Sequence, residues 1–201
     1  MAGAIDPKKP NDVDLVKNSV ENPEEFVHIM HRYEKPLARY LRHLINASTD
    51  DIEDLLQNVF IKVYSNLNDF DVGLSFSSWI YRIAHNEAID HVRKLKRRPV
   101  AARPSLDSED DENEFEKIAD DFDIATESDK HFLKQNVAKV LDLLDPKYRS
   151  VLVLKFLEDK DYNEISDILK KPIGTVGTLI NRAKKQFRQK AESLGLRIEH
   201  L

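Results

Sequence analysis

Apolar residues recur at helical spacing along several long stretches of the chain, and short polar breaks separate these stretches. In the first stretch apolar side chains return every three or four positions, which places them on one face of an α-helix. They are Phe26, Ile29, Met30, Tyr33, Leu37, Tyr40, Leu41 and Leu44. Pro36 lies inside this pattern and predicts a kink, because proline cannot donate a backbone hydrogen bond.

Two more helices are predicted after the polar residues 46–50. The apolar face of the first consists of Ile52, Leu55, Leu56, Val59, Phe60 and Val63. A loop with Gly73 follows, and the next helix is predicted to start at Phe76 and to continue into a basic end. Trp79, Ile83, Ile89 and Val92 recur near helical spacing in it and are its expected core-facing residues.

A second group of helices is predicted from Lys130 onward. Its first two apolar stripes are Leu133, Val137, Val140, Leu141 and Leu144, and then Tyr148, Val151, Leu152 and Phe156. Asp161 and Glu164 have the spacing of a capping box, which predicts the start of a short helix. Its inward residues Ile165, Ile168 and Leu169 precede a turn at 170–174, and the last helix buries Val176, Leu179, Ile180, Ala183 and Phe187. The pattern is that of a helix, a tight turn and a helix.

Composition and the distribution of charge indicate the fold class and the domain boundaries. The chain has 201 residues, of which 33% are charged and only 5 are glycine, so we expect an all-α fold. The net charge of −5 hides an acidic block at 107–129 and a basic block at 170–190. We therefore predict two small helical domains, at 23–98 and 129–192, joined by a flexible acidic linker at 99–128. An N-terminal extension at 1–22, whose opening residues resemble a cloning remnant, and a tail at 193–201 complete the plan.

Several classes of function are disfavoured. The absence of cysteine excludes disulfides, thiolate zinc sites and cysteine nucleophiles in this chain. His28 and His31 lie three residues apart, but the sequence places no third ligand near them, so we expect no metal site and no cofactor. No constellation resembles a catalytic site, so we do not expect an enzyme. There is no apolar run of about 18 residues and no signal peptide, so we expect no membrane insertion and a cytoplasmic location.

Two segments carry groups that bind nucleic acids. In the segment from Phe76 to Arg98, Trp79 and Tyr81 stand beside cations, and aromatic faces next to positive charge suit unpaired bases. A solvated basic helix end remains the alternative. The last helix carries hydrogen-bonding and cationic groups on its outward face, which suits base edges and phosphates. Here the alternative is a plain helical hairpin.

Three motifs occur in a fixed order: DIEDLLQNVFIKVY at 51–64, FSSWIYRIAHNEAIDHVR at 76–93 and YNEISDILKKPIGTVGTLINRAKKQF at 162–187. Together they resemble bacterial alternative sigma factors of the extracytoplasmic-function type, in the sigma-70 family. The resemblance implies a sigma region 2 domain before the linker and a region 4 domain after it. In such proteins region 2 docks on core RNA polymerase and opens the −10 element of promoter DNA, while region 4 reads the −35 element.

The resemblance also implies roles for single residues. Polymerase docking falls on Asp54, Gln57, Asn58 and Ile61. A flipped −10 base is held by Phe70 and Asn86 with Ser75 lining the pocket, while Tyr81, Arg82, Arg93, Arg97 and Arg98 contact DNA nearby. The −35 contacts fall on Thr175, Gly177, Thr178, Asn181, Arg182, Lys184, Lys185 and Arg188. Relatives commonly carry a cation and a serine at the positions of Gly177 and Thr178, so −35 recognition is expected to be weaker or altered.

The sequence thus predicts an alternative sigma factor with core RNA polymerase and promoter DNA as partners, and with an anti-sigma factor that masks the docking face or the last helix. One alternative is a free-standing helix-turn-helix regulator that binds an operator without polymerase. Another is a sigma mimic that titrates an anti-sigma factor; the basic residues 93–98 argue against it, because a mimic needs no phosphate contacts.

Overall fold

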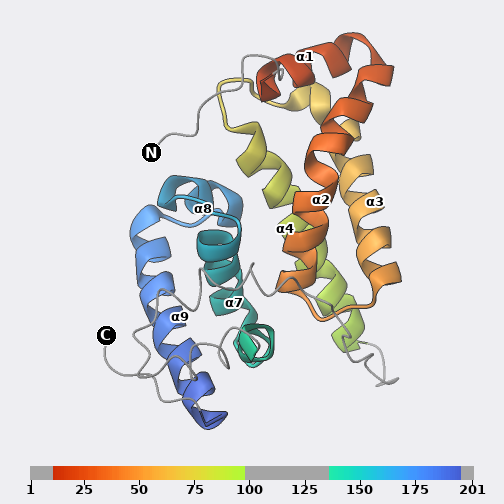
Figure 1. Ribbon diagram of the computed structural model, residues 1–201. Coiled ribbons are helices and arrows are strands. Elements are labelled where there is room, and N and C mark those ends of the chain that lie inside the picture. The colour runs from red at the N-terminus through yellow and green to blue at the C-terminus, as the bar shows by residue number, and fades with distance from the viewer. Residues whose placement is uncertain (1–10, 98–135, 196–201) are drawn as a thin grey trace.

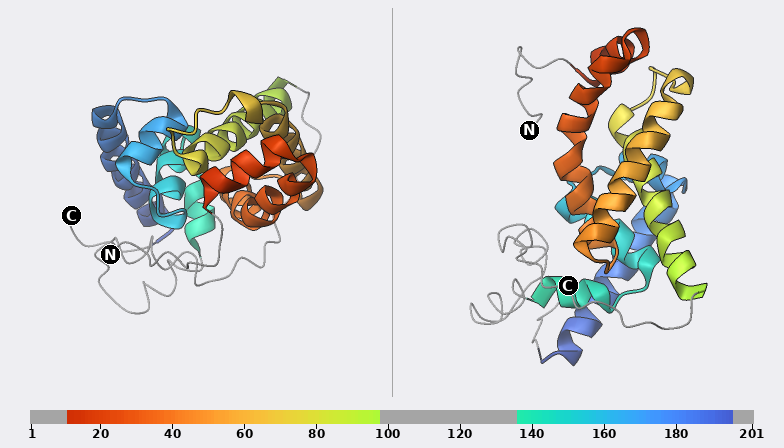
Figure 2. Two further views of the ribbon diagram at one scale, coloured as in Figure 1. Left: turned by 90° about the horizontal axis from the view of Figure 1, so that it is seen from above. Right: turned by 90° about the vertical axis from the view of Figure 1, so that its right-hand side faces the viewer.

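The computed structural model describes residues 11–97 and 136–195, and every regular element in these two ranges is helical. Figure 1 shows two groups of helices side by side, α1 to α4 in one and α7 to α9 in the other, and the views in Figure 2 show the same division. The prediction of an all-α fold with two helical domains is confirmed. The predicted flexible linker lies outside the described residues.

The first domain contains α1 (Asp12–Glu21), a 3₁₀ turn (Pro23–Glu25), α2 (Phe26–Leu44), α3 (Thr49–Ser65), a second 3₁₀ turn (Leu67–Asp69) and α4 (Phe76–Arg97). The sequence placed α1 in an extension, yet this helix packs on α2. Leu15 and Val16 are buried in the core. Asp12 accepts hydrogen bonds from Arg32 (2.7 Å) and from the Tyr33 hydroxyl (2.6 Å), which tie α1 to α2.

Local sequence explains where α2 and α3 begin and end. α2 runs through Pro36 and ends at Leu44. Ser48 begins α3 with a capping box, in which its hydroxyl accepts from the backbone of Asp51 and the Asp51 carboxylate accepts from the backbone of Ser48. These bonds satisfy amide groups that a helix start leaves without partners. Both apolar stripes predicted for α2 and α3 are buried except at Met30, which is exposed.

The predicted core face of α4 was wrong in detail. The buried residues of this helix are Phe76, Ile80, Tyr81, Ala84 and Ala88 together with Ser78, whereas Trp79, Ile83, Ile89 and Val92 are only partly buried. α4 packs against α2 and α3 and also against α8 of the second domain. Its buried surface is therefore wider than one stripe. Two alanines form part of this surface, and a search for large apolar residues at helical spacing does not detect them.

The second domain contains helical residues 136–142, α7 (Pro146–Leu152), a π-helical turn (Val153–Leu157), α8 (Tyr162–Leu169) and α9 (Ile173–Ser193). The predicted capping box at Asp161 and Glu164 is present. Lys170 ends α8 in the left-handed backbone conformation (φ 51°), and α9 starts three residues later. The predicted helix, tight turn and helix are confirmed.

Candidate polymerase and nucleic-acid surfaces

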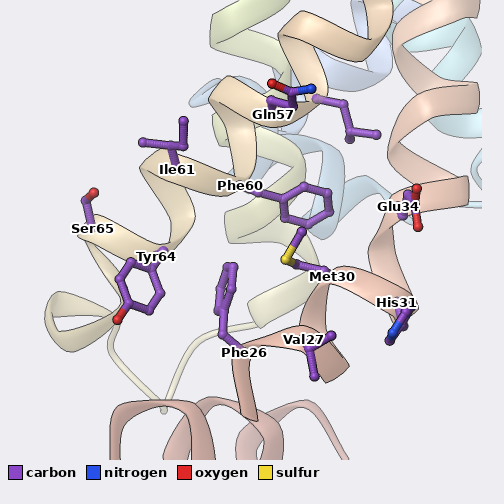
Figure 3. A pocket seen from close by; sticks show the side chains of 11 residues that line it. Phe26, Val27, Met30, His31, Glu34, Gln57, Phe60, Ile61, Tyr64 and Ser65 are labelled. Carbon is purple, nitrogen blue, oxygen red and sulfur yellow. The ribbon is translucent and has the colours of Figure 1, made fainter. Parts of the chain in front are cut away.

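An apolar groove runs between α2 and α3 on the outer side of the first domain. It has a volume of about 510 Å³, and its walls are Phe26, Val27, Met30, His31, Glu34, Leu56, Gln57, Phe60, Ile61, Tyr64 and Ser65. Figure 3 shows Phe26, Met30 and Phe60 pointing into the space between the two helices. The ring of Phe26 packs edge-on against those of Phe60 and Tyr64, which holds the floor of the groove in place. We call this the α2–α3 groove.

All four residues expected to dock polymerase are exposed on α3. Gln57 and Ile61 line the α2–α3 groove, and Ile61 is 62% exposed despite its apolar side chain. Asp54 and Asn58 lie outside the groove walls. The sequence reasoning missed the α2 wall. It assigned Met30 to the buried face of α2, whereas Met30 and the apolar Val27 are both exposed there.

A smaller cavity of about 330 Å³ lies between α3 and α4. Its walls are Lys62, Asn66, Asp69, Trp79, Ile83, Asn86 and Glu87. Lys62 forms an ion pair with Glu87, and the cavity carries two amides, two carboxylates and an ammonium beside the Trp79 ring. We call it the α3–α4 cavity. Asn86 was expected here, whereas the opposed charges of Lys62 and Glu87 on neighbouring helices were missed.

Phe70 lies behind this cavity rather than in its wall. The side chain is 7% exposed and packs against the rings of Phe76 and Trp79, at centroid distances of 5.2 and 5.1 Å. Trp79 was expected in the core, but it is only partly buried and lines the cavity. The structure therefore brings Asn86 together with the indole ring, while a direct role for Phe70 in holding a base stays a prediction.

The other residues expected at the −10 element have different surroundings. Ser75 is exposed, and its hydroxyl accepts a hydrogen bond from the backbone of Ser78, which caps the start of α4. Tyr81 is only 4% exposed, because the second domain covers it. Arg82 is half-buried, and the exposed Arg93 pairs with Asp90 on the same helix (3.2 Å). Arg98 and the side chain of Arg97 lie outside the described residues.

The outward face of α9 is mostly open. The exposed members of the expected −35 set are Thr175, Thr178, Asn181, Arg182 and Lys185, and the others are half-buried. Lys184 lies over the Phe156 ring, at 5.9 Å from its centroid. Nε and Nη2 of Arg188 are enclosed and make no hydrogen bond within the described part of the chain. Arg182 and Lys185 are therefore the cations of this set that a phosphate reaches most easily.

Gly177 is not required by packing. A Cβ atom at this position would meet Tyr162 Cε1 at 3.7 Å, which is an ordinary contact. The helix therefore has room for a side chain here, and the glycine removes a group from the expected DNA face without a structural need.

The described residues form neither a metal-binding cluster nor a helix that could cross a membrane. Within residues 11–97 and 136–195, no three His, Asp or Glu side chains are placed to hold a metal ion together. His28 lies 3.5 Å from Glu25, and His31 lines the α2–α3 groove. In the same ranges no helix has the length and apolar character needed to cross a membrane.

Comparison with known proteins places these surfaces in a family. Residues 29–98 match the family described as Sigma-70 region 2, and residues 134–187 match Sigma-70, region 4. The ECF RNA polymerase sigma factor SigW of Bacillus subtilis is 34% identical over 149 residues, covering 72% of this chain and 77% of SigW. The chain belongs to the ECF sigma factors. The ECF RNA polymerase sigma-E factor of Escherichia coli K12 is 30% identical over 166 residues, covering 81% of this chain and 84% of the relative.

Two solved structures show the same fold. CnrH in complex with the cytosolic domain of CnrY has a TM-score of 0.65 at 23% identity, covering 90% of this chain and 97% of that one. RpoE of Bartonella quintana, in complex with the anti-sigma factor NepR, has a TM-score of 0.60 at 19% identity, covering 84% and 98%. The first domain of this ECF sigma factor is region 2 and the second is region 4. The protein is an alternative sigma factor that directs the initiation of transcription.

Proposed function

We propose that this sigma factor binds core RNA polymerase through the α2–α3 groove, holds an unpaired −10 base in the α3–α4 cavity and reads the −35 element with α9. The observation that carries the proposal is the groove, because it joins exposed apolar side chains into one concave surface. Such patches mark protein-binding sites when polar residues rim them. The bond-forming chemistry of transcription belongs to the polymerase in this scheme.

The groove supports docking of a helical partner. Phe26, Phe60 and Tyr64 form a rigid aromatic floor, and Ile61 and Met30 offer apolar contact at the edge. Aromatic residues in a preformed groove supply much of the binding energy of an interface at a small entropic cost. The same surface is our proposed site for an anti-sigma partner, because a protein that fills the groove excludes polymerase.

The α3–α4 cavity supports recognition of one flipped base. At about 330 Å³ it is close to the small end of ligand pockets, and the Trp79 ring gives it one flat wall. The Asn86 amide can both donate to and accept from a base edge. The Glu87 carboxylate accepts hydrogen bonds and the Lys62 ammonium donates them, so the cavity offers both kinds of group to a base edge.

The exposed face of α9 supports recognition of duplex DNA. The second helix of a helix-turn-helix enters the major groove, where side chains near its start reach base edges. Thr175, Thr178 and Asn181 are exposed in the first half of α9, whereas Arg182 and Lys185 lie further along. The first three are therefore proposed to contact bases, and the two cations to contact phosphates.

Abortive transcription with purified core polymerase on a set of promoter fragments tests the proposal. We expect product that depends both on the sigma factor and on the fragment. Asn86→Ala should reduce opening of the −10 element, since a good bidentate base contact is worth roughly 1–3 kcal/mol, and permanganate footprinting measures the opened bases. Asn68→Ala, which changes an exposed asparagine outside the cavity walls, is the matched control.

Two results would count against this assignment. A protein that binds duplex DNA tightly but never supports product with polymerase would favour a free-standing regulator. Normal opening by the Asn86 variant would remove the base cavity from the scheme.

A further inference from the structure

The α3–α4 cavity is backed by a cluster of packed aromatic rings. Trp79 lines the cavity, and the centroid of its ring lies 5.1 Å from that of Phe70 and 5.5 Å from that of Phe76. Phe70 and Phe76 are buried and contact each other edge-on at 5.2 Å. Close-packed side chains leave little room for movement, so the orientation of the indole wall depends on the rings behind it.

The cluster extends from Phe76 to Tyr33 of α2 and from there to Asp12 of α1. The rings of Tyr33 and Phe76 meet edge-on at a centroid distance of 5.6 Å, and the Tyr33 hydroxyl donates to Oδ2 of Asp12 at 2.6 Å. Burial, together with the charge of Asp12 and its hydrogen bond, raises the pKa of Tyr33 well above its usual value, so the hydroxyl keeps its proton and remains a donor. Contacts therefore continue from Asp12 through Tyr33 and Phe76 to Trp79, and we call these four residues the aromatic row.

α1 also supports the cavity from a second side. It packs against α4 and against the 3₁₀ turn Leu67–Asp69, and Figure 1 shows it lying across the end of the domain where α4 begins. That turn supplies Asp69 to the cavity wall and leads directly into Phe70. The buried side chains of Leu15 and Val16 fix α1 in this place. Both the turn and the aromatic row therefore rest on α1.

The Asp12 carboxylate is the directional part of this support. Its Oδ1 accepts from Arg32 at 2.7 Å while its Oδ2 accepts from Tyr33, so the carboxylate is held from two sides. Hydrogen bonds to an ionised acceptor are short and strong, and they fix geometry. Apolar burial is not directional, so the packing of α1 alone does not set the tilt of the Tyr33 ring.

We propose that Asp12 and Tyr33 are positioning residues for strand opening, which hold Phe76 and, through it, the Trp79 wall of the α3–α4 cavity. The use of the cavity for a −10 base rests on the proposed function, whereas the coupling of α1 to Trp79 does not. Neither Asp12 nor Tyr33 lines the cavity or the α2–α3 groove. Their effect on DNA is therefore indirect, and α1 is part of the strand-opening unit.

Trp79 fluorescence provides the first test, because Trp79 is the only tryptophan of the protein. Tyr33→Phe keeps the ring and removes the bond to Asp12, and Asp12→Ala removes the acceptor. Both should shift the emission of the free protein to longer wavelength and increase its quenching by acrylamide. Tyr148→Phe, at a buried tyrosine of α7, and Asp14→Ala, at an exposed acid of α1, are the matched controls. Circular dichroism checks that each variant is folded. Unchanged emission in folded Tyr33→Phe protein would overturn the proposal.

A conservative variant separates the hydrogen bond from the charge. Asp12→Asn loses the ion pair with Arg32, yet in either orientation its amide keeps a hydrogen bond with the Tyr33 hydroxyl, which both donates and accepts. Its emission should match that of the unaltered protein. Asp12→Ala combined with Tyr33→Phe should shift the emission no further than either change alone, since both remove the same bond. Equal shifts in the Asn and Ala variants, or additive shifts in the double variant, would contradict the role of this bond.

Promoter opening provides the last test and separates this inference from the proposed function. On a fragment active in abortive transcription, Tyr33→Phe and Asp12→Ala should lower permanganate reactivity at the −10 element about fivefold. Affinity for core polymerase and for −35 duplex should stay the same. Normal opening by both variants, where Asn86→Ala prevents it, would reject the positioning role and leave the proposed function intact; reduced opening without a shift of Trp79 emission would reject it as well. Normal opening by Asn86→Ala would remove the cavity from the proposed function, while Trp79 emission would still decide whether Asp12 and Tyr33 hold the indole wall.

Discussion

Region 2 has two faces that differ in chemistry and in accessibility. The outer face, between α2 and α3, is apolar and open. The inner face, on α4 and α2, is held to region 4 by Glu158, Lys160 and Arg149. An apolar groove gains free energy when a partner covers it, whereas the buried charge of Glu158 depends on hydrogen-bonding partners from the other domain.

The largest expected effect is a loss of polymerase affinity when the outer face is changed. Ile61→Asp places a charge against the apolar α2–α3 groove, and we expect core polymerase affinity to fall by about 3 kcal/mol, on the order of 100-fold. The fold should be unaffected because Ile61 is 62% exposed. Fluorescence titration with labelled protein measures the affinity. Val20→Asp, at an exposed apolar residue of α1 outside the groove, should bind normally. Reduced affinity in both variants, or in neither, would contradict the docking face.

The next effect is a loss of stability at low pH, which we expect from His85 on the inner face. Burial and, to a lesser degree, the charge of Lys171 lower the pKa of His85 from 6.5 to about 4. The unfolded chain therefore takes up a proton more readily between pH 6.5 and 4. The stability from neutral His85 is complete above about pH 6.5 and is lost as the pH falls toward 4. By linkage this loss is about 2–3 kcal/mol at pH 4.5.

Urea unfolding at pH 7 and pH 4.5 measures this contribution. The unaltered protein should lose more stability than a His85→Gln variant, in which other titrating groups remain but the imidazole is absent. Lys171→Ala should raise the pKa of His85 if region 4 lies against region 2 in solution. The groove variant Ile61→Asp should leave that pKa unchanged. Equal pH dependence with and without His85 would contradict the prediction.

A smaller effect compares the open face of α9 with its half-buried cations. Arg182→Ala with Lys185→Ala should weaken −35 duplex binding and flatten its salt dependence, by roughly 0.9 in log–log slope for each phosphate that the protein no longer neutralises. Asn181→Ala should change base preference instead. Anisotropy titrations at several salt concentrations distinguish the two results. Lys17→Ala, at an exposed cation of α1, is the control. A slope that stays the same in the double variant would exclude both cations as phosphate-binding groups.

The smallest effect is a change of stability in region 4 that leaves both faces of region 2 unaltered. Gly177→Ala should stabilise the protein by about 0.5–1 kcal/mol, because alanine is the better helix former and its Cβ meets Tyr162 at an ordinary distance. Thermal unfolding measures this change. Polymerase affinity should remain the same. A destabilised variant would show that the glycine is required in α9 after all.

The sequence by itself determined the local features of the fold. Helical spacing located α2, α3 and α9, and the pair Asp161 and Glu164 located the start of α8, since such signals depend on residues a few positions apart. The motifs around these helices identified the family. Gln57, Ile61 and Asn86 were placed on their surfaces for the same reason, as each sits at a fixed register within one helix.

Only the tertiary structure decided which surfaces meet. The α2 wall of the groove, the pairing of Lys62 with Glu87 and the burial of Tyr81 each depend on two elements brought together from different parts of the chain. Glu158 is the clearest case. In the sequence it is an ordinary acidic residue after an apolar run, and no local pattern marks it. Its contacts arise because folding removes it from water and places Arg39 and Tyr81 within hydrogen-bonding distance, where a buried charge requires partners.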